Sequence, residues 1–279
     1  MPRRVVIDSD IANEVDDPFA IAHALLAPEV YRVEAITLAP FRRDGLTAAD
    51  SIRLSRELGQ RTLDAIGAQV PMVDGGVFLA SGTEPSESEA VDYLLEASQE
   101  PLLILGIGAC TNIASAILRD PEFQDRVEVW WLGGHSGELS AWEYNLIGDV
   151  HASRVLLESR VPLTVFPAWG VTSNLLVSLA ALERDIEPTG PLGALLTRLI
   201  RDHQQDHFAY EKELWDVAVM AYGIDPGWFR WKDLPRPTFD QELNWVAQLD
   251  AAPMRRITWL ERNPILRDLF RRVATSGTR

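Results

Sequence analysis

The 279-residue chain has one cysteine, two lysines and no long apolar run. Because Cys110 has no second cysteine to pair with, no disulfide can form within the chain. No apolar run approaches the roughly 20 residues that a helix needs to cross a bilayer. Residues 1–5 lack the apolar stretch and small-residue cleavage site of a signal peptide. We therefore expect a soluble, cytoplasmic protein.

The chain also lacks an excess of positive charge. Its 41 acidic residues outnumber its 26 Lys and Arg residues, which gives a formal net charge of -15. This balance gives no support to a nucleic-acid partner or to an anionic membrane surface. Solubility accounts for most of the acidity, and part of it fits a carboxylate cluster that binds a cation. Hydrophobic residues make up 47%, which is enough for a packed core.

Short apolar runs alternate with amphipathic segments along most of the chain. Such alternation is typical of βαβ units and predicts an α/β fold with an open, mostly parallel sheet flanked by helices. We expect residues 243–249 and 256–260 to pair as a small antiparallel C-terminal edge. With no internal repeat and no Gly/Ser linker, residues 1–279 are predicted to form a single domain. The predicted strands are 4–8, 33–38, 102–105, 127–132 and 163–166, and the predicted helices are 16–26, 47–58, 87–98, 112–118, 150–157, 192–203, 214–222 and 264–273.

Polar residues follow three of the predicted strands. Asp8 and Asp10 end the first strand, Thr111 follows the strand at 102–105, and Glu143 and Asn145 come after the strand at 127–132. In open α/β sheets, ligands bind beyond the carboxyl ends of the strands. We therefore expect these residues to share one edge of the sheet.

Four aspartates lie within ten positions near the N-terminus: Asp8, Asp10, Asp16 and Asp17. Packed together without a cation they would repel one another or take up protons. A hard divalent ion such as Ca²⁺ removes that conflict because it binds several oxygens at once. The alternative is that Asp16 and Asp17 only cap a helix while the other two face solvent. The spacing Asp-x-Asp-x5-Asp-Asp directly after a strand favours the metal site.

The same stretch resembles the N-terminal signature of the inosine-uridine-preferring nucleoside hydrolase family. Three later segments also resemble family motifs, in the family order. The usual family signature has three residues between the second Asp and the Asp pair, and this chain has five. In this it is similar to a bacterial branch with Asn-Glu-Ile/Val-Asp-Asp at that place. The four segments are Val-Ile-Asp-Ser-Asp-Ile-Ala-Asn-Glu-Val-Asp-Asp-Pro-Phe-Ala-Ile (6–21), Gly-Ala-Cys-Thr-Asn-Ile-Ala (108–114), Leu-Gly-Gly (132–134) with Glu-Tyr-Asn (143–145), and Leu-Trp-Asp-Val-Ala-Val (214–219).

The resemblance implies Ca²⁺-dependent hydrolysis of the N-glycosidic bond of a ribonucleoside or modified nucleoside, giving ribose and free base. It also implies a role in purine or pyrimidine salvage and a homodimer or homotetramer. The implied calcium ligands are Asp10, Asp17, Asp216 and the backbone carbonyl of Thr111, with Asp8 as support of the metal site. Asp16 would be the general base, and Glu143 and Asn145 would bind ribose hydroxyls.

The chain departs from the family pattern at Trp215, where many members have a histidine that protonates the leaving base. Indole cannot donate a proton usefully. Trp215 either stacks on the base or packs in the core, and both readings stay open. Replacement acids are sought among His135, which follows the Gly-Gly turn, and His203 and His207, which precede Asp216.

Two further departures concern the sugar. Gly137 stands where the family often has an asparagine that contacts the 5′ end of the ribose. The two extra residues within 11–15 are expected to bring Asn13 and Glu14 close to the sugar. We therefore include Asn13, with His135 and Trp215, among the candidate substrate-binding residues.

Two other classes of protein stay open. Asp8-Ser9-Asp10 after a strand is also similar to haloacid-dehalogenase-type phosphatases. Those usually have Thr or Val where this chain has Ala12, and neither Lys212 nor Lys232 is well positioned in the sequence for their catalytic lysine. The other class is a non-catalytic, metal-dependent ribose- or nucleoside-binding protein. Calcium-dependent release of free base distinguishes the hydrolase from both.

Overall fold

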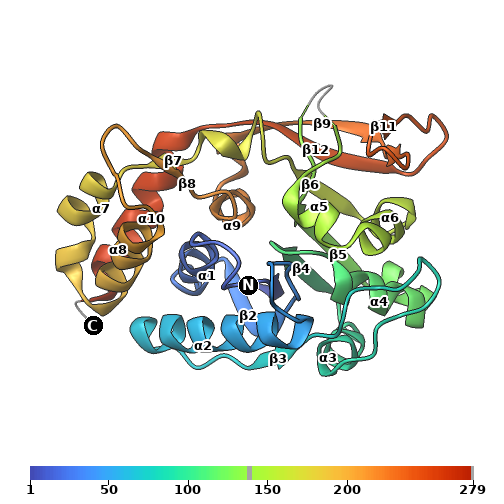
Figure 1. Cartoon of the computed structure of the whole chain (residues 1–279), viewed down its shortest axis with the longest axis horizontal. Coiled ribbons are helices and arrows are strands. Elements are labelled where there is room, and N and C mark those ends of the chain that lie inside the picture. Colours follow the sequence, from blue (N-terminus) through green and yellow to red (C-terminus); the bar gives the residue numbers. More distant parts are fainter. Residues whose placement is uncertain (137–139, 278–279) are drawn as a thin grey trace.

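The computed structural model describes residues 1–136 and 140–277, which are built around an eight-stranded sheet (Figure 1). Each strand is parallel to its neighbour except the last, which is antiparallel. The prediction of a mostly parallel α/β fold is therefore confirmed. The strand order is β3 (Met72–Asp74), β2 (Tyr31–Leu38), β1 (Arg3–Ser9), β4 (Leu102–Gly106), β5 (Val127–Leu132), β6 (Leu163–Phe166), β12 (Pro253–Leu260) and β9 (Phe229–Pro235).

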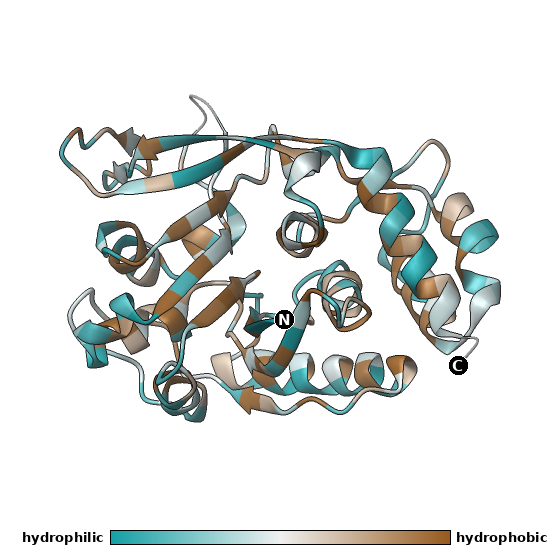
Figure 2. Cartoon of the chain, turned by 180° about the vertical axis from the view of Figure 1, so that it is seen from behind, coloured by the Kyte–Doolittle hydropathy of each residue, from teal (hydrophilic) through white to brown (hydrophobic). Residues whose placement is uncertain are grey.

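The central strands bury side chains on both faces. In β1, Val5 and Ile7 pack into one hydrophobic core and Val6 into the other. Two-sided burial explains why these strands have almost continuous apolar sequences. Figure 2 shows the resulting concentration of hydrophobic residues along the sheet and on the inner sides of the helices. The first core includes α1 (Asp17–Leu25), α2 (Ala48–Ile66), α8 (Pro191–His203), α9 (Val217–Ile224) and α10 (Arg262–Ser276), and the second includes α3 (Glu89–Ala97), α4 (Thr111–Arg119) and α6 (Val150–Glu158).

Local signals set the limits of several helices. The hydroxyl of Thr47 accepts the backbone N–H of Asp50, whose carboxylate accepts the backbone N–H of Thr47, so a capping box begins α2. The helix ends at Gly67, which has a φ of 76° that favours glycine. Its last helical residue, Ile66, lies eight residues, or about two turns, beyond the predicted helix at 47–58. The shorter elements are α5 (Tyr144–Gly148), α7 (Leu179–Asp185), β7 (Leu176–Val177), β8 (Lys212–Glu213), β10 (Thr238–Phe239) and β11 (Trp245–Val246).

The predicted pairing at the C-terminal edge is wrong in its partner. Residues 256–260 belong to β12, which pairs antiparallel with β9 and not with residues 243–249. The latter segment contains β11, which pairs with β10 in a separate two-stranded sheet. β9 escaped detection because it is an edge strand whose central residues, such as Arg230 and Lys232, are exposed and polar. An edge strand needs no apolar alternation, and its charges discourage pairing with other chains.

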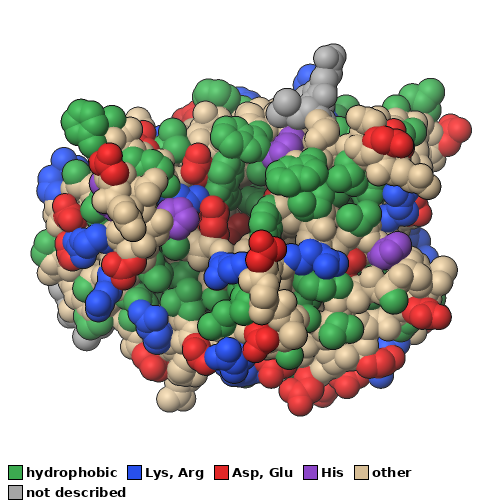
Figure 3. Space-filling view, viewed as in Figure 1, with side chains coloured by type: hydrophobic (Ala, Val, Ile, Leu, Met, Phe, Trp, Pro, Cys, Tyr) green, Lys and Arg blue, Asp and Glu red, His purple; other side chains and the backbone are tan. Residues whose placement is uncertain are grey.

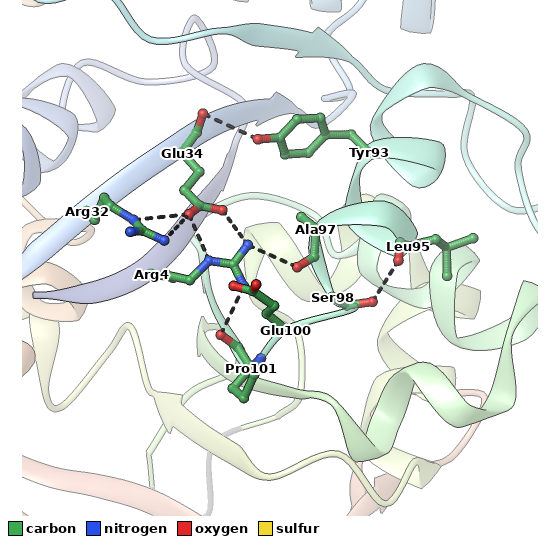
Figure 4. Close-up of polar contacts among 9 residues, drawn as sticks. All are labelled: Arg4, Arg32, Glu34, Tyr93, Leu95, Ala97, Ser98, Glu100 and Pro101. Atoms are coloured by element: carbon green, nitrogen blue, oxygen red, sulfur yellow. Dashed lines mark hydrogen bonds and ion pairs between the residues drawn. The ribbon is translucent and has the colours of Figure 1, made fainter.

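The amino ends of β1 and β2 are fastened to α3 by polar contacts (Figure 4). Arg4 donates two hydrogen bonds of 2.8 Å to the two carboxylate oxygens of Glu34, and a third of 3.2 Å to the carbonyl of Ala97. Tyr93 donates to the carbonyl of Glu34 at 3.3 Å. The charges of Arg4 and Glu34 are paired within this cluster. The contacts fix the start of β1, at the opposite end of the strand from Asp8 and Asp10.

In the part of the chain that the structure describes, no helix has both the length and the apolar character needed to cross a membrane.

Candidate metal and active site

A cavity of about 380 Å³ opens at the carboxyl ends of the adjacent strands β1, β4 and β5. Figure 3 shows a hollow near the centre of the molecular face, with acidic side chains in its depth and hydrophobic side chains above it. This is the edge at which the sequence predicted a ligand site. The described lining residues are Asp10, Asn13, Glu14, Asp16, Asp17, Arg43, Ile107, Leu132, His135, Trp142, Glu143, Tyr144, Asn145, Ala168, Trp169, Trp215 and Asp216.

The aspartate pair lies at the start of α1. Asp16 occupies the N-cap position, but its side chain makes no capping hydrogen bond. Asp17 is the first helical residue, and its Oδ1 accepts a 2.6 Å hydrogen bond from the hydroxyl of Ser9. The alternative that Asp16 only caps this helix is therefore wrong. Pro18 lies in the first turn, where the absence of an N–H costs nothing.

Asp216 joins this pair from far along the chain. The predicted helix at 214–222 begins later, at Val217, so Asp216 is the N-cap residue of α9. Its backbone N–H donates to Oδ2 of Asp16 at 3.1 Å. Carboxylate oxygens of Asp16, Asp17 and Asp216 lie within 4.8 Å of one another. Asp10 lines the same cavity outside this triplet and accepts a 3.0 Å hydrogen bond from the Asn13 side chain.

Burial makes this cluster unfavourable as a set of free anions. It raises the pKa of Asp17 to about 7, and together with neighbouring carboxylates it raises the pKa of Asp10 and Asp216 well above the usual range. Burial and then Glu14 raise the pKa of Asp16 in the same way. A divalent cation among these oxygens would offset the repulsion. The all-oxygen, anionic donor set fits a hard ion such as Ca²⁺.

Asp8 is fully buried and is not among the described residues that line the cavity. Its Oδ1 accepts hydrogen bonds from Thr37 at 2.6 Å and from Asn112 at 2.8 Å. Its Oδ2 has no partner among the described residues, and burial raises the pKa of Asp8 to about 6. Asp8 thus ties β1 to β2 and α4 beneath the loop that carries Asp10.

One cation near the cluster was missed by sequence reasoning. The Lys212 ammonium is almost fully buried and lies 3.1 Å from Oε1 of Glu14. Burial lowers the pKa of Lys212, but Asp16 and Glu14 outweigh this effect and raise the pKa overall. In turn, Lys212 opposes the rise in the pKa of Asp16. A lysine four positions before Asp216, in a chain with only two lysines, was the available signal.

The loop at 11–15, which is two residues longer than in the usual family signature, borders the site, and Asn13 and Glu14 both line the cavity. Their closeness to a bound sugar stays a prediction. Arg43 fixes this loop from the side, because its guanidinium donates to the carbonyls of Ala12 at 3.0 Å and Asn13 at 2.7 Å. Arg43 also lines the cavity, and the sequence gave no indication of this role.

Glu143 and Asn145 come together at the start of α5. The carboxylate of Glu143 accepts the backbone N–H groups of Gly134, Asn145 and Leu146 at 3.0–3.1 Å. Burial raises the pKa of Glu143 to about 7. The Asn145 amide donates to the carbonyls of Leu132 at 3.0 Å and Ile107 at 3.4 Å. Asn145 Oδ1 accepts no hydrogen bond from the described residues and is therefore available to a ligand.

Four aromatic side chains border the cavity: Trp142, Tyr144, Trp169 and Trp215. Trp215 is half-buried and packs against the first core while also lining the cavity. Its stacking on a base stays a prediction. Its ring meets that of Trp169 edge to face, with centroids 5.6 Å apart. The other three rings are exposed, and sequence reasoning did not single them out. Trp142 comes from the loop before α5, Tyr144 is the first residue of α5, and Trp169 comes from the loop after β6.

Of the candidate replacement acids, only His135 is among the described lining residues. Its Nδ1 accepts the backbone N–H of Trp169 at 3.3 Å, and burial lowers the pKa of His135. His203 and His207 are not among the described lining residues, although His203 lies close enough to Lys212 and Glu14 for both to affect its pKa. Gly137 falls outside the described residues. Thr111 is buried, and its hydroxyl donates to Asp149 at 2.8 Å. The role of its backbone carbonyl as a calcium ligand stays a prediction.

An open α/β sheet with a buried carboxylate cluster at its carboxyl edge is typical of proteins that bind a small ligand there, and in this chain a candidate metal site lies at that edge. The chain belongs to the inosine-uridine preferring nucleoside hydrolase family, whose model matches residues 5–257. This is a family of enzymes that hydrolyse N-glycosidic bonds.

The proteins that the chain resembles are named for different substrates. It is 23% identical to the pyrimidine-specific ribonucleoside hydrolase RihA of Photobacterium profundum, over 82% of each chain. It is 24% identical to an uncharacterized protein of Schizosaccharomyces pombe, over 80% of this chain and 76% of that one. Among solved structures, the purine-preferring ribonucleoside hydrolase of Gardnerella vaginalis has a TM-score of 0.79 at 19% identity, with 99% of both chains covered. That likeness shows the fold.

Proposed function

We propose that this protein is a Ca²⁺-dependent ribohydrolase that cleaves the N-glycosidic bond of a ribonucleoside or modified nucleoside. The observation that carries the proposal is the buried triplet of Asp16, Asp17 and Asp216. It brings together carboxylates from both halves of the chain at the edge of the sheet where such folds bind ligands. Carboxylates are rarely buried together unless a cation or a reaction needs them.

We assign Asp10, Asp17, Asp216 and the Thr111 carbonyl as the residues that would hold calcium, with Asp8 bracing Asp10 from below. When bound, the ion would supply a Lewis acid that acidifies a water and fixes the 2′ and 3′ hydroxyls of the ribose. Asp16 would then accept the proton of that water. The Asp216 N–H already engages Oδ2 of Asp16, which leaves its other oxygen for this step.

The remaining lining residues would orient the substrate. Asn145 Oδ1 has no partner among the described residues and would accept a ribose hydroxyl. Glu143 accepts the backbone N–H of Asn145 and so lies beside it. Its carboxylate would favour the positive charge that develops on the sugar as the bond breaks. Asn13 would lie at the sugar, while Trp215 and His135 would lie at the base. Fixing both halves of the substrate supplies the positioning part of the rate enhancement.

The test is a screen of purified protein against purine, pyrimidine and modified ribonucleosides, with free base and ribose measured at saturating Ca²⁺ and again after addition of a chelator. We expect base release that the chelator abolishes and that added Ca²⁺ restores. Phosphate release from a phosphate ester would favour the haloacid-dehalogenase-type alternative. Saturable nucleoside binding with neither product would mean a binding protein. Either result would contradict the proposal.

Two broader expectations belong with this proposal. We expect a homodimer or homotetramer that works in the cytoplasm on a salvage reaction. Size-exclusion chromatography with light scattering, run with and without Ca²⁺, measures the first. A mass equal to a single 31.1 kDa chain at working concentration would contradict it.

A further inference from the structure

We propose that the preferred substrates are ribonucleosides whose base carries a fixed positive charge, such as an N-ribosylpyridinium or an N7-alkylated purine ribonucleoside. The inference rests on the proposed N-glycosidic hydrolysis and names the class of base. Three features of the described part of the cavity support it. Its lining residues offer no acid for the leaving base, its carboxylates outnumber its cations, and exposed aromatic rings form its border.

The first argument is the fate of the leaving group. When the bond between C1′ and the base nitrogen breaks, its electron pair stays on that nitrogen. A neutral base then leaves as an anion unless an acid protonates it, which is why general acid catalysis accelerates such reactions by about 10²–10⁴-fold. A cationic base leaves as a neutral molecule. The water oxygen bonds to C1′ and its proton passes to Asp16, so no proton donor is needed.

The lining residues that the structure describes offer no such donor. The indole of Trp215 cannot act as one. Nδ1 of His135 accepts an N–H and burial lowers the pKa of this histidine, so the ring is neutral near pH 7. The Tyr144 hydroxyl donates to the carbonyl of Arg42. Both oxygens of Glu143 are engaged by backbone N–H groups.

The second argument is charge. Six carboxylates are among the described lining residues of the cavity, and Arg43 is the only Lys or Arg among those residues. Lys212 reaches one of these carboxylates, Glu14, from behind. A divalent ion, Arg43 and Lys212 together would bring four positive charges, so carboxylates stay in excess even with Glu143 counted as neutral. A cationic base is attracted by this excess, whereas a neutral base gains nothing from it.

The third argument is the aromatic border. Trp142, Tyr144 and Trp169 are exposed at the cavity, with Trp169 retaining 53% of its surface. Aromatic faces bind cations that approach within about 6 Å of the ring centroid. The Lys212 ammonium already lies 5.6 Å from the centroid of the Trp215 ring. A planar cation would combine stacking with this electrostatic attraction.

A binding experiment measures the effect of the ligand's charge separately from the hydrolysis step, because neither ligand is hydrolysed. We would titrate the Ca²⁺-loaded protein with 1-methylnicotinamide, which is a cation, and with neutral nicotinamide, and follow tryptophan fluorescence and calorimetric heat. The cation should bind about tenfold tighter or more. Trp169→Leu should remove most of this preference. Trp259→Leu, which changes a tryptophan of equal exposure (52%) outside the cavity, should leave it intact. Equal affinities for the two ligands would overturn the inference.

Turnover gives the second arm. We would compare kcat/KM for 7-methylguanosine and guanosine, each divided by its uncatalysed hydrolysis rate, because cationic nucleosides are more labile in water. After this correction the cationic substrate should keep an advantage of about tenfold or more, because the acidic and aromatic cavity binds its base more tightly. Equal corrected values would overturn the charge preference and leave the ribohydrolase assignment standing. If neither these nor any other nucleoside is hydrolysed with Ca²⁺ present, the proposed function itself fails and the substrate class falls with it.

Discussion

The backbone N–H of Asp216 donates a 3.1 Å hydrogen bond to Oδ2 of Asp16, a residue 200 positions earlier in the chain. Each of the two residues is the N-cap of its helix, and neither uses its side chain to cap it. The contact fixes one oxygen of Asp16 and leaves Oδ1 without a partner among the described residues. Two distant segments therefore position a single carboxylate oxygen at the cavity.

This relationship predicts the behaviour of Asp16→Asn. The asparagine can keep its carbonyl oxygen toward the Asp216 N–H but cannot accept the proton of a water. We expect kcat to fall by about 10³-fold, while the calorimetric Kd for Ca²⁺ changes only a few-fold. Because Asp16 also lies within the carboxylate triplet, a large loss of Ca²⁺ affinity would instead identify it as a metal ligand.

Asp216→Asn tests the far end of the same cluster. Loss of one anionic oxygen ligand should weaken Ca²⁺ binding by about tenfold or more, because hard cations depend on the charge of their ligands. Calorimetry of the metal-free protein gives the Kd, and activity should recover at high Ca²⁺. Asp250→Asn makes the same charge change at an exposed residue outside the cavity and serves as the control. Equal affinities in the two variants would exclude Asp216 as a ligand.

Lys212→Met tests the buried cation. Lys212 opposes the rise in the pKa of Asp16, so its removal should raise that pKa further. The base must be ionised to act, and the acidic limb of the pH profile of kcat/KM should therefore move to higher pH. Lys232→Met, at the exposed lysine of β9, is the matched control. A profile of Lys212→Met that is scaled down without a shift would mean that the lysine only holds the loop through Glu14.

The buried carboxylates also predict how stability depends on pH. Burial raises the pKa of Asp17 to about 7, above its value in the unfolded chain. The folded metal-free protein thus binds more protons than the unfolded one between about pH 4 and 7, and its stability falls as pH rises through this window. Each unit of pKa shift corresponds to about 1.4 kcal/mol.

Thermal unfolding of the metal-free protein should therefore show a lower Tm at pH 8 than at pH 5.5. Added Ca²⁺ should raise the Tm more at pH 8 than at pH 5.5, because at pH 5.5 the ion must first displace protons from the carboxylates. In Asp17→Asn, which has no carboxyl group to titrate at that position, the fall should be smaller. A Tm that is level or rises over this range without Ca²⁺ would contradict the proposed cause.

Local features of the sequence predicted much of the fold. The apolar run at the start of the chain became β1, and Pro18 after the aspartate pair marked the start of α1. These predictions succeeded because burial on both faces of a parallel sheet imposes an almost continuous apolar sequence, and because helix starts have local chemistry. The prediction of the C-terminal edge failed because the local sequence of that edge carries no such signal. β9 is exposed and polar, so its pairing with β12 depends on contacts distant in sequence.

The same division holds for the site. The sequence by itself determined that Asp10, Asp16 and Asp17 follow a buried strand and so reach the ligand-binding edge, because parallel strands bring their carboxyl ends to one side. Only the tertiary structure decided which charges and rings accompany them. Lys212 comes to Glu14, Arg43 to the loop at 11–15, and Trp169 to Trp215 through folding of the whole chain. No local sequence pattern predicts these contacts, because each contact depends on how several helices and strands pack together.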